Sequence, residues 1–513
     1  MRSISDMLRH PLAIRVALVV YVLCLVGLIT AYFHVTTMDI SYSAYIQGPA
    51  VFRAGEASAL RGVVMDARTG RTLLNIRSLR LELRDAEGLA RDLGGAAAGP
   101  SGMIHFSARV PAGVKPGTYT LVMRADIDGA AEPFETGGPV RVEAPPEVKP
   151  LASAPLPEGE SRLIKEMESG QETVDPGVYE RSGAVRLEVV PSRLELPSSI
   201  PGRFWVRAID AETGEPLRCD VQLKREAGLG SALPASVKTG LVGLASVPIK
   251  PVSAQTIKLT ASCPSAQEGQ PARQGTAQVY AAAVASEVSL QLKEPAVLAG
   301  TRTGGVVQSL HQSGAILTDV RDLDGRWLSA AAFGLGEGAS GVRVTPPGPL
   351  GAEPARIVRV QIYTSLFRQG VGWDAQHLLS VGNGQSRGEV VMWLIRRLAA
   401  QPGASKAYDY LSGRNAALLS QLDIKQLNDL TFAALADIPA RFDEPVIVLN
   451  NQKADRDKLE AWKADQRAAL LSMILLAGLI GLCALAVAVL GYLSASDARR
   501  REMARRGGLL LTL

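Results

Sequence analysis

The uncharged run from Ala468 to Ser496 constrains the fold of this chain more than any other stretch. Charged residues bracket it, with Asp465 and Arg467 before it and Asp497 and three arginines directly after it. A bilayer core of about 30 Å needs roughly 20 apolar helical residues. The run therefore predicts a transmembrane helix at 468–493, and the rest of the chain has to be arranged around it.

A second apolar run, 16–33, lies near the N-terminus. It is longer than the apolar core of a usual signal peptide, and no A-x-A cleavage pattern follows it, which favours a retained membrane anchor. A cleaved signal peptide is the alternative. The sequence thus predicts two transmembrane helices that flank one large extramembrane region.

Basic residues close to a span set its orientation, because cytoplasmic flanks carry an excess of Lys and Arg. The arginines next to the two spans are Arg2, Arg9 and Arg15 before the first, and Arg499, Arg500, Arg501, Arg505 and Arg506 after the second. We therefore expect the segments 1–15 and 494–513 to be cytoplasmic. The high Ala, Gly and Arg content fits a GC-rich bacterium, so we expect a bacterial inner-membrane protein with a large periplasmic region.

The formal net charge of +5 belongs to these flanks. Segments 1–15 and 494–513 hold eight of the 55 basic and three of the 50 acidic residues, which leaves 47 of each in the remainder. A nucleic-acid-binding protein needs a basic patch on its folded part, so we expect no nucleic-acid partner. The basic tail mainly sets topology and secondarily attracts anionic membrane lipid.

The region 42–143 has the pattern of a β domain. Leu79–Asp85 and Thr118–Arg124 alternate strictly between apolar and polar residues, which is typical of half-buried strands. Turn residues separate such runs at 66–70, 85–88 and 111–117. Short strands with regular turn signals favour a β-sandwich.

The segments FRAGEASALRGVVMDARTG, LRLELRDAEG and GMIHFSARVPAGVKPGTYTLVMRA together resemble the second macroglobulin-type (MG2) domain of bacterial α2-macroglobulin-like proteins. The residues that occupy the positions of the family pattern are Gly55, Glu56, Asp66, Gly70, Asp85, Gly88, Phe106, Gly117 and Tyr119. The resemblance implies a sandwich fold over 42–143. The thioester motif C-G-E-Q of that family is absent, so the resemblance implies no protease trapping.

A Pro-rich linker is predicted at 144–182, followed by a second Ig-like sandwich at 183–291. In this domain a strand, a D-x-x-T-G turn and a second strand follow one another in the same order as in the first domain. Residues 183–291 are therefore a candidate second copy. Cys219 and Cys263 both fall on the apolar faces of their predicted strands. A disulfide between them is expected in an oxidising compartment, and two buried free thiols are the alternative.

The remaining extramembrane region changes from strands to helices. A third, divergent β domain is predicted at 295–380, with its clearest strand at Arg356–Phe367. A helical region follows at 386–450, where Ser386 and Glu389 form a capping box and two more helices are expected near 406–422 and 424–438. A stalk helix at 454–467 is then expected to run without a break into the second span. The predicted fold class is mainly β: tandem Ig-like or macroglobulin-type sandwiches with a C-terminal helical region, flanked by two transmembrane helices.

No catalytic motif stands out. The chain has no H-E-x-x-H, C-x-x-C, G-x-S-x-G or P-loop pattern, so we expect no enzyme, no cofactor and no metal site. Asp319, Asp322 and Asp324 lack the spacing of an EF-hand, and a solvated turn is the preferred interpretation over a calcium site.

Two small-x-x-x-small pairs in the second span, Ala477/Gly481 and Ala484/Ala488, allow close helix packing in lipid. They suit pairing of the two spans, a homo-oligomer or a membrane partner, although such pairs also arise by chance in an Ala-rich span. The leading functional hypothesis is a non-enzymatic scaffold that binds a membrane or periplasmic protein partner, or itself, in an envelope assembly. The alternatives are a polysaccharide copolymerase-like chain-length regulator and, less favoured, an envelope hydrolase.

Overall fold

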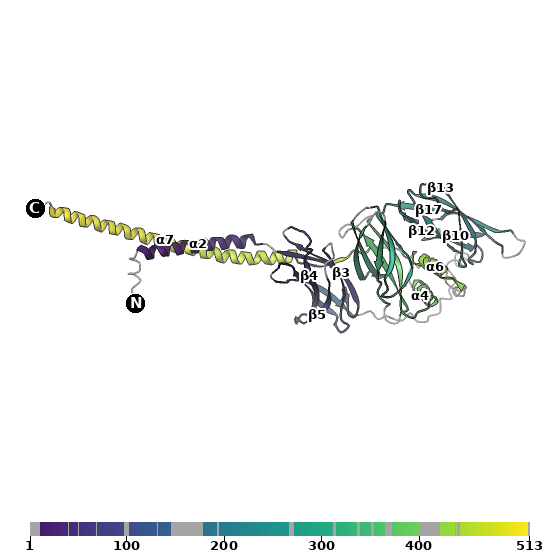
Figure 1. Cartoon of the computed structure of the whole chain (residues 1–513), viewed down its shortest axis with the longest axis horizontal. Helices are drawn as coiled ribbons and strands as arrows, with labels where there is room; N and C mark the ends of the chain where they lie inside the picture. The colour runs from purple at the N-terminus through teal and green to yellow at the C-terminus, as the bar shows by residue number, and fades with distance from the viewer. Residues whose placement is uncertain are drawn as a thin grey trace. The chain divides into compact units, whose positions relative to one another are not determined.

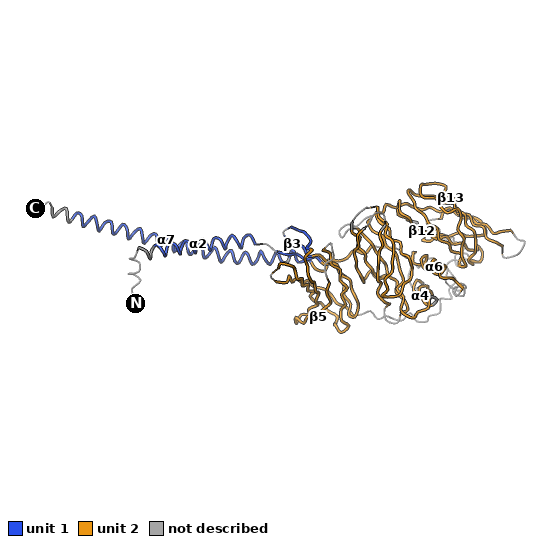
Figure 2. Tube along the Cα trace, viewed as in Figure 1, with its two compact units in different colours: residues 1–45, 64–73, 450–513 blue, residues 46–63, 74–449 orange. Residues whose placement is uncertain are grey.

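The computed structural model of this chain (Figure 1) describes residues 11–510 except 39–40, 50, 68, 97–101, 131, 145–177, 192–193, 266–270, 311–313, 336–338, 350–352, 365–371, 400–420, 437 and 439–441. Two compact units divide it: residues 1–45, 64–73 and 450–513, and residues 46–63 and 74–449 (Figure 2). The described part is mainly β, and its helices are α2 (Pro11–Thr37), α4 (Arg387–Ala399), α6 (Ile424–Ala436) and α7 (Gln452–Leu510).

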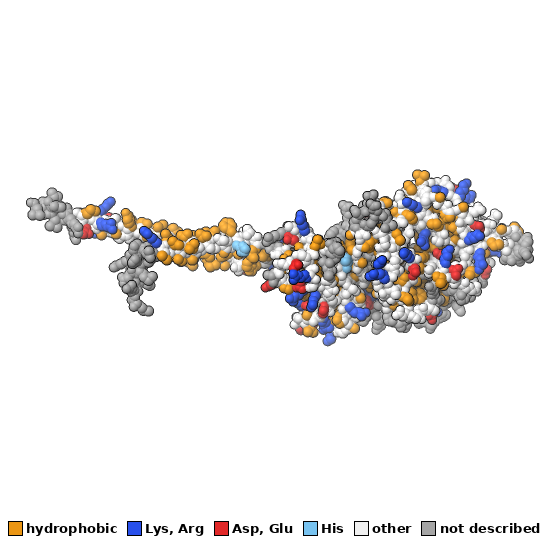
Figure 3. Space-filling model, in the orientation of Figure 1, with side chains coloured by type: hydrophobic (Ala, Val, Ile, Leu, Met, Phe, Trp, Pro, Cys, Tyr) orange, Lys and Arg blue, Asp and Glu red, His pale blue; other side chains and the backbone are white. Residues whose placement is uncertain are grey.

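Helices α2 and α7 lie side by side in the first unit (Figure 1). Both are long and apolar enough to cross a membrane, over Arg15–Thr37 and within Asp455–Ala504. Apolar side chains cover much of their paired surface (Figure 3). Helix α7 runs through the predicted stalk and span without a break and continues through most of the basic tail. Its 59 residues correspond to about 89 Å at the standard helical rise.

The first β region contains two sheets. Their strand orders are β26-β1-β3-β6 and β2-β8-β7-β4-β5. The strands are β1 (Tyr42–Gly48), β2 (Val51–Arg53), β3 (Ala57–Asp66), β4 (Ile76–Arg84), β5 (Ala90–Ala96), β6 (Met103–Arg109), β7 (Gly117–Ile127), β8 (Phe134–Glu143) and β26 (Val446–Asn450). The predicted strands at 79–85 and 118–124 are confirmed as β4 and β7, and they pair with each other. Strand β26 comes from the far end of the sequence, which the alternation pattern did not reveal.

The second β region has one core shared by two sheets, which are ordered β10-β12-β15 and β11-β17-β16-β13-β14, with β9 on β17. The strands are β9 (Val178–Gly183), β10 (Val185–Val190), β11 (Leu194–Pro197), β12 (Gly202–Asp210), β13 (Asp220–Ala227), β14 (Ser236–Lys238), β15 (Leu244–Ile249), β16 (Gln255–Cys263) and β17 (Arg273–Val284). The predicted linker overlaps β9, because residues 178–183 pair antiparallel with 275–279 and so satisfy their backbone groups. The part of the linker at 145–177 lies outside the described residues.

The third β region also places residues of two sheets in one core, with orders β18-β20-β23 and β19-β25-β24-β21-β22. The strands are β18 (Val288–Leu292), β19 (Ala296–Leu298), β20 (Thr303–Ser309), β21 (Gly314–Asp322), β22 (Trp327–Leu335), β23 (Ala339–Val344), β24 (Ala355–Tyr363) and β25 (Trp373–Val381). The region begins earlier than the predicted 295, because β18 pairs with β20 rather than with the preceding strands.

Helices α4 and α6 belong to a core that also contains residues of the second and third β regions. Trp205 of β12 and Leu379 of β25 are in this core, together with Leu394 of α4 and Leu430 of α6. The predicted capping box is confirmed: Ser386 N–H donates to Glu389 over 2.8 Å, and Glu389 N–H donates to the Ser386 hydroxyl over 3.3 Å. The helix expected near 406–422 falls almost entirely outside the described residues.

The two D-x-x-T-G turns have the same geometry. Asp66 Oδ1 accepts from the N–H of Thr69 and Asp210 Oδ1 from the N–H of Thr213, both near 2.9 Å. Gly70 and Gly214 close the turns with φ values of 68° and 70°, a conformation that favours glycine. The sequence repeat therefore reflects one turn used twice.

Candidate functional site

Tyr21 of α2 and Gly481 of α7 are in contact inside the apolar pair. The Tyr21 hydroxyl donates to the carbonyl oxygen of Ala477 over 2.8 Å. A Cβ atom at Gly481 would lie 2.3 Å from the Tyr21 hydroxyl oxygen. The Ala477/Gly481 pair therefore packs against the other helix of the same chain, whereas Ala484 and Ala488 are exposed.

The predicted topology residues are distributed around these helices. Arg15 lies in α2, and Arg499, Arg500 and Arg501 lie in α7; all four are exposed. Arg505 and Arg506 also belong to α7, whereas Arg2 and Arg9 lie outside the described residues. The described arginines therefore lie toward the N-terminal end of α2 and the C-terminal end of α7.

Asn451 joins the start of α7 to the strand that follows α2. Its side-chain oxygen accepts from the N–H of Ala44 over 2.7 Å, and its backbone oxygen accepts from the N–H of Asp455 over 2.8 Å. Asn451 itself is buried. An Asn directly before a helix is a common N-terminal cap, but the contact with Ala44 depends on residues 407 positions apart, which no local pattern reveals.

Cys219 and Cys263 form a disulfide in the second β region. Cys219 directly precedes β13, and Cys263 is the last residue of β16. Both cysteines belong to the core of that region. Cys24 and Cys483, in the two apolar helices, are free and exposed.

Arg61 of β3 is the centre of a buried polar cluster between the first and third β regions. Its Nη2 donates to Oδ1 of Asp319 over 2.8 Å and its Nη1 donates to the Tyr363 hydroxyl. Its guanidinium carbon lies 5.3 Å from the Trp327 ring centre, within cation–π range. Four strands therefore supply one closely packed charged cluster.

One face of the sheet β21-β24-β25 is polar although it is buried. The side chains on it include Asp319, Arg321, Arg359, Gln361 and His377, whereas the opposite face contributes Val320, Val358 and Val360 to an apolar core. Strands buried on both faces usually read as continuous apolar runs. Here the alternation of charged and apolar residues suggests an exposed face that the fold in fact covers.

Residues 442–443 lie against this polar face. Asp443 pairs with Arg359, and its N–H donates to Gln361 over 3.2 Å. The Phe442 ring contacts the rings of Tyr363 and Trp373, with centroid distances of 5.5 Å in both cases. A short segment between α6 and β26 is thereby attached to the third β region.

The interpretation of Asp319, Asp322 and Asp324 as a solvated turn is wrong for the first two residues. Asp319 is fully buried, and Asp322 is almost fully buried between Arg326 and Arg356 at 2.7 and 2.8 Å. Arg326 also pairs with Glu56 of the first β region at 2.9 Å. Arg61 and Arg356 come from other strands, so the local sequence suggested exposure; Arg326 lies in the turn that follows Asp322.

Burial shifts the pKa values of several groups. Burial, with Arg61 nearby, lowers the pKa of His105 to about 4, and burial beside Arg359 lowers that of His377 to about 4. Burial, together with Asp319, raises the pKa of the Tyr363 hydroxyl. Burial also raises the pKa of Asp374 to about 6. The two histidines are therefore neutral at pH 7.

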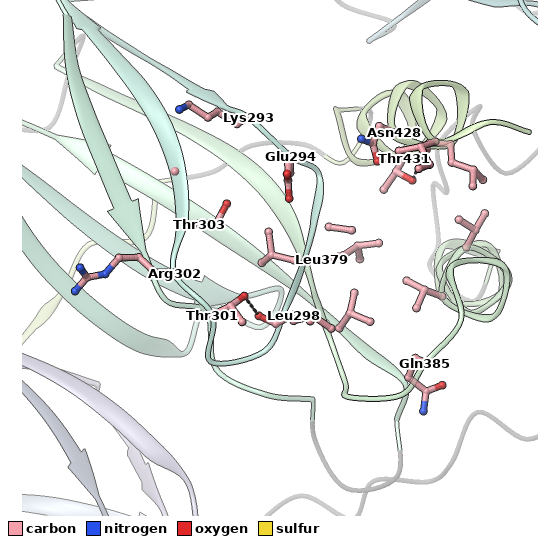
Figure 4. Close-up of a pocket in the computed structure, with 18 residues that line it drawn as sticks. Lys293, Glu294, Leu298, Thr301, Arg302, Thr303, Leu379, Gln385, Asn428 and Thr431 are labelled. Carbon is pink, nitrogen blue, oxygen red and sulfur yellow. Dashed lines mark hydrogen bonds between the residues drawn. The ribbon is translucent and has the colours of Figure 1, made fainter.

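A pocket of about 600 Å³ lies between β19, β20 and β25 on one side and α4 and α6 on the other (Figure 4). Leu379, Val381, Val390, Val391 and Leu427 give it an apolar lining. The exposed polar side chains around it are Lys293, Glu294, Arg302 and Gln385. An apolar lining with a few polar groups at its margin suits a binding pocket.

The described residues contain no group of three or more His, Cys, Asp or Glu side chains placed to hold a metal ion. The arginines and the tyrosine of the buried cluster are covered rather than open to a substrate.

No family model and no curated protein matches this chain. Solved structures to which it is similar include the α2-macroglobulin of E. coli, at 14% identity and a TM-score of 0.16, over 66% of this chain and 22% of that one. The α2-macroglobulin of Salmonella matches at 13% identity and a TM-score of 0.16, over 67% and 23%. PorU of Porphyromonas gingivalis matches at 11% identity and a TM-score of 0.22, over 67% and 34%.

This chain spans about a quarter of the length of the bacterial macroglobulins that it matches. These neighbours agree with the resemblance in residues 42–143 only as to a macroglobulin-like β fold. At such identities and TM-scores the likeness supports no statement about activity, partner or family membership.

Proposed function

We propose that this chain is a non-enzymatic, two-span protein of a bacterial inner membrane, whose β-sandwich modules, arranged in tandem, form a periplasmic scaffold for a protein partner. Both termini lie in the cytoplasm in this proposal, as the arginines flanking the apolar helices favour. Green fluorescent protein fused to the C-terminus is expected to fluoresce in cells, because it folds poorly after export in an unfolded state. Absence of fluorescence at normal expression would contradict this topology.

The observation that carries the proposal is the join at Asn451. The chain leaves α2 into β1 and enters α7 from β26, and the Asn451 side chain bonds the backbone of Ala44 at that point. Tyr21 and Gly481 hold the two helices together farther along. A scaffold that transmits force or position needs such a fixed attachment, whereas a tethered enzyme does not.

The contacts that join the β regions within residues 46–63 and 74–449 support the same function. Buried ion pairs connect the first and third β regions, and one apolar core connects the second and third regions through α4 and α6. Modules joined in this way keep a fixed spacing. Fixed spacing is what a scaffold supplies to its partners.

The pocket beside α6 is the partner site in this proposal. Ile424 lines it and is 61% exposed, whereas Leu229, in the second β region, is 67% exposed away from it. Photo-crosslinking residues placed at each position of the full chain in living cells are expected to yield a discrete crosslinked product from position 424 only. Introduction of Ile424→Asp should remove a product formed from a neighbouring pocket position such as Gln385.

Leu229→Asp is the matched control and should leave the crosslinked product unchanged. Equal crosslinking from positions 424 and 229, or none from position 424 in cells that express the protein stably, would contradict the assignment of this pocket. A hydrolytic activity of the purified chain on peptides, esters or peptidoglycan would contradict the non-enzymatic role.

A further inference from the structure

Three basic side chains lie in a row across the buried polar face of the third β region. Arg321 of β21 is the direct cross-strand partner of Arg359 of β24, which is in turn the partner of His377 of β25. Direct partners in an antiparallel sheet point to the same face, with Cβ atoms about 5 Å apart. All three side chains are more than nine-tenths buried.

Several nitrogen atoms of this row have no hydrogen-bond partner among the described residues. They are Nε and Nη2 of Arg321, Nε of Arg359 and Nε2 of His377. Arg321 Nη2 lies 3.7 Å from the Asp319 carboxylate, beyond hydrogen-bond distance. Buried polar groups in folded proteins nearly always have a partner, so such unpaired atoms point to a bound water or ion.

The charges decide between a water and an ion. The cluster holds the positive charges of Arg61, Arg321 and Arg359 against the negative charges of Asp319 and Asp443, which leaves one positive charge. The lowered pKa values of His105 and His377 keep both rings neutral. An uncompensated buried charge is strongly destabilising, and water does not neutralise it.

The neighbouring cluster provides an internal comparison. Its charges are those of the buried Asp322 and Arg356 and the half-buried Glu56 and Arg326, which sum to zero; the nearby Asp324 carboxylate is mostly exposed. Two clusters of similar composition thus differ in balance by one charge. The unbalanced one contains the four unpaired nitrogens of the row, whereas the balanced one contains a single such atom, Nε of Arg326.

We propose that the row formed by Arg321 and Arg359 binds one small monovalent inorganic anion of the size and charge of chloride. The anion accepts hydrogen bonds from the free guanidinium nitrogens and neutralises the remaining positive charge. Asp319 and Asp443 lie close by, which disfavours a dianion such as sulfate. The site would strengthen the connection between the first and third β regions and does not depend on the proposed function.

Thermal unfolding of the full chain in detergent tests this, with chloride replaced stepwise by gluconate at constant ionic strength. We expect Tm to rise by a few degrees and to saturate as chloride increases, because a ligand that binds only the folded state stabilises it. Arg321→Gln removes the surplus charge and should abolish the chloride dependence. Arg326→Gln, in the balanced cluster, should lower Tm but keep the dependence.

An unchanged Tm of the wild-type chain across the chloride series would overturn the proposal, and so would an equal chloride dependence in Arg321→Gln. Crystals of the wild-type chain soaked in bromide give a test without mutation. An anomalous peak within hydrogen-bond distance of Arg321 and Arg359 is expected. Density for an ordered water with no anomalous signal at that position would contradict the anion site.

Discussion

The Arg61 guanidinium donates from Nη2 to Oδ1 of Asp319 over 2.8 Å, and both side chains are almost completely buried. The two residues are 258 positions apart and belong to different β regions. Removal of one partner of a buried, hydrogen-bonded ion pair typically costs 3–5 kcal/mol. This contact is therefore the most sensitive point of the connection between the two regions.

Arg61→Met and Asp319→Leu are each expected to lower the free energy of unfolding by about 3–5 kcal/mol, measured by urea titration of the full chain in detergent. The double variant should be more stable than the sum of the two losses predicts, because neither Arg61 nor Asp319 is then left without the other. Strictly additive losses would mean that the two side chains are not coupled.

Gly481→Leu is expected to separate or twist the two apolar helices, because even a Cβ at this position would overlap the Tyr21 hydroxyl. The free Cys24 and Cys483 are natural sites for spin labels, since the other two of the four cysteines are bonded to each other. Pulsed electron paramagnetic resonance in nanodiscs should show a longer or broader distance between the labels.

Gly478→Leu is the matched control for that experiment. A Cβ at Gly478 meets no atom within 4 Å, so the distance distribution should stay as in the wild-type chain. The same change in both variants would show that added bulk in α7, rather than contact with Tyr21, alters the pair.

Loss of the Cys219–Cys263 disulfide is expected to destabilise the second β region. The cysteines are 44 positions apart, and closing a loop of that size contributes about 4 kcal/mol in the chain-entropy description. The double substitution Cys219→Ala and Cys263→Ala should lower the urea midpoint, whereas Cys24→Ser should not. An unchanged midpoint in the double variant would show that the bond contributes no net stability.

Stability should fall as the solution is acidified. The folded-state pKa of His377 is about 4, against roughly 6.5 for an unperturbed histidine. The native state thus disfavours protonation, so the contribution is complete above pH 6.5 and is lost as the pH falls toward 4. The shift corresponds to about 3 kcal/mol, and His105, shifted in the same direction, adds to it.

Urea titrations between pH 7 and 4 measure this loss. His377→Gln should flatten the profile because Gln does not titrate, whereas His34→Gln, on the exposed end of α2, should leave it unchanged.

Asp374 acts in the opposite direction, since its pKa is raised to about 6 and its contribution to stability is lost as the pH rises. Asp374→Asn should therefore steepen the net decline on acidification, and an unaltered slope would refute the shift at Asp374.

Local patterns in the sequence predicted the elements whose cause is local. The length of the apolar runs predicted the two membrane-type helices, and strict alternation of apolar and polar residues predicted β4 and β7. The Ser386–Glu389 capping box predicted the start of α4. The D-x-x-T-G repeat gave two equivalent turns. Hydrophobic period, turn chemistry and capping act over a few residues, so they can be read along the chain.

The tertiary structure alone decided which charges are buried. Asp319, Arg321 and Arg359 alternate with apolar residues as in a solvated strand, and Asp322 stands at the start of a turn. Side chains from β3, β24 and the 442–443 segment nevertheless cover or pair with them. The bond between Asn451 and Ala44 likewise depends on tertiary structure, because it forms where β26 pairs with β1 in the first β region. The burial of a charge depends on partners between 34 and 258 positions away in these pairs, and that information is absent from any local stretch of sequence.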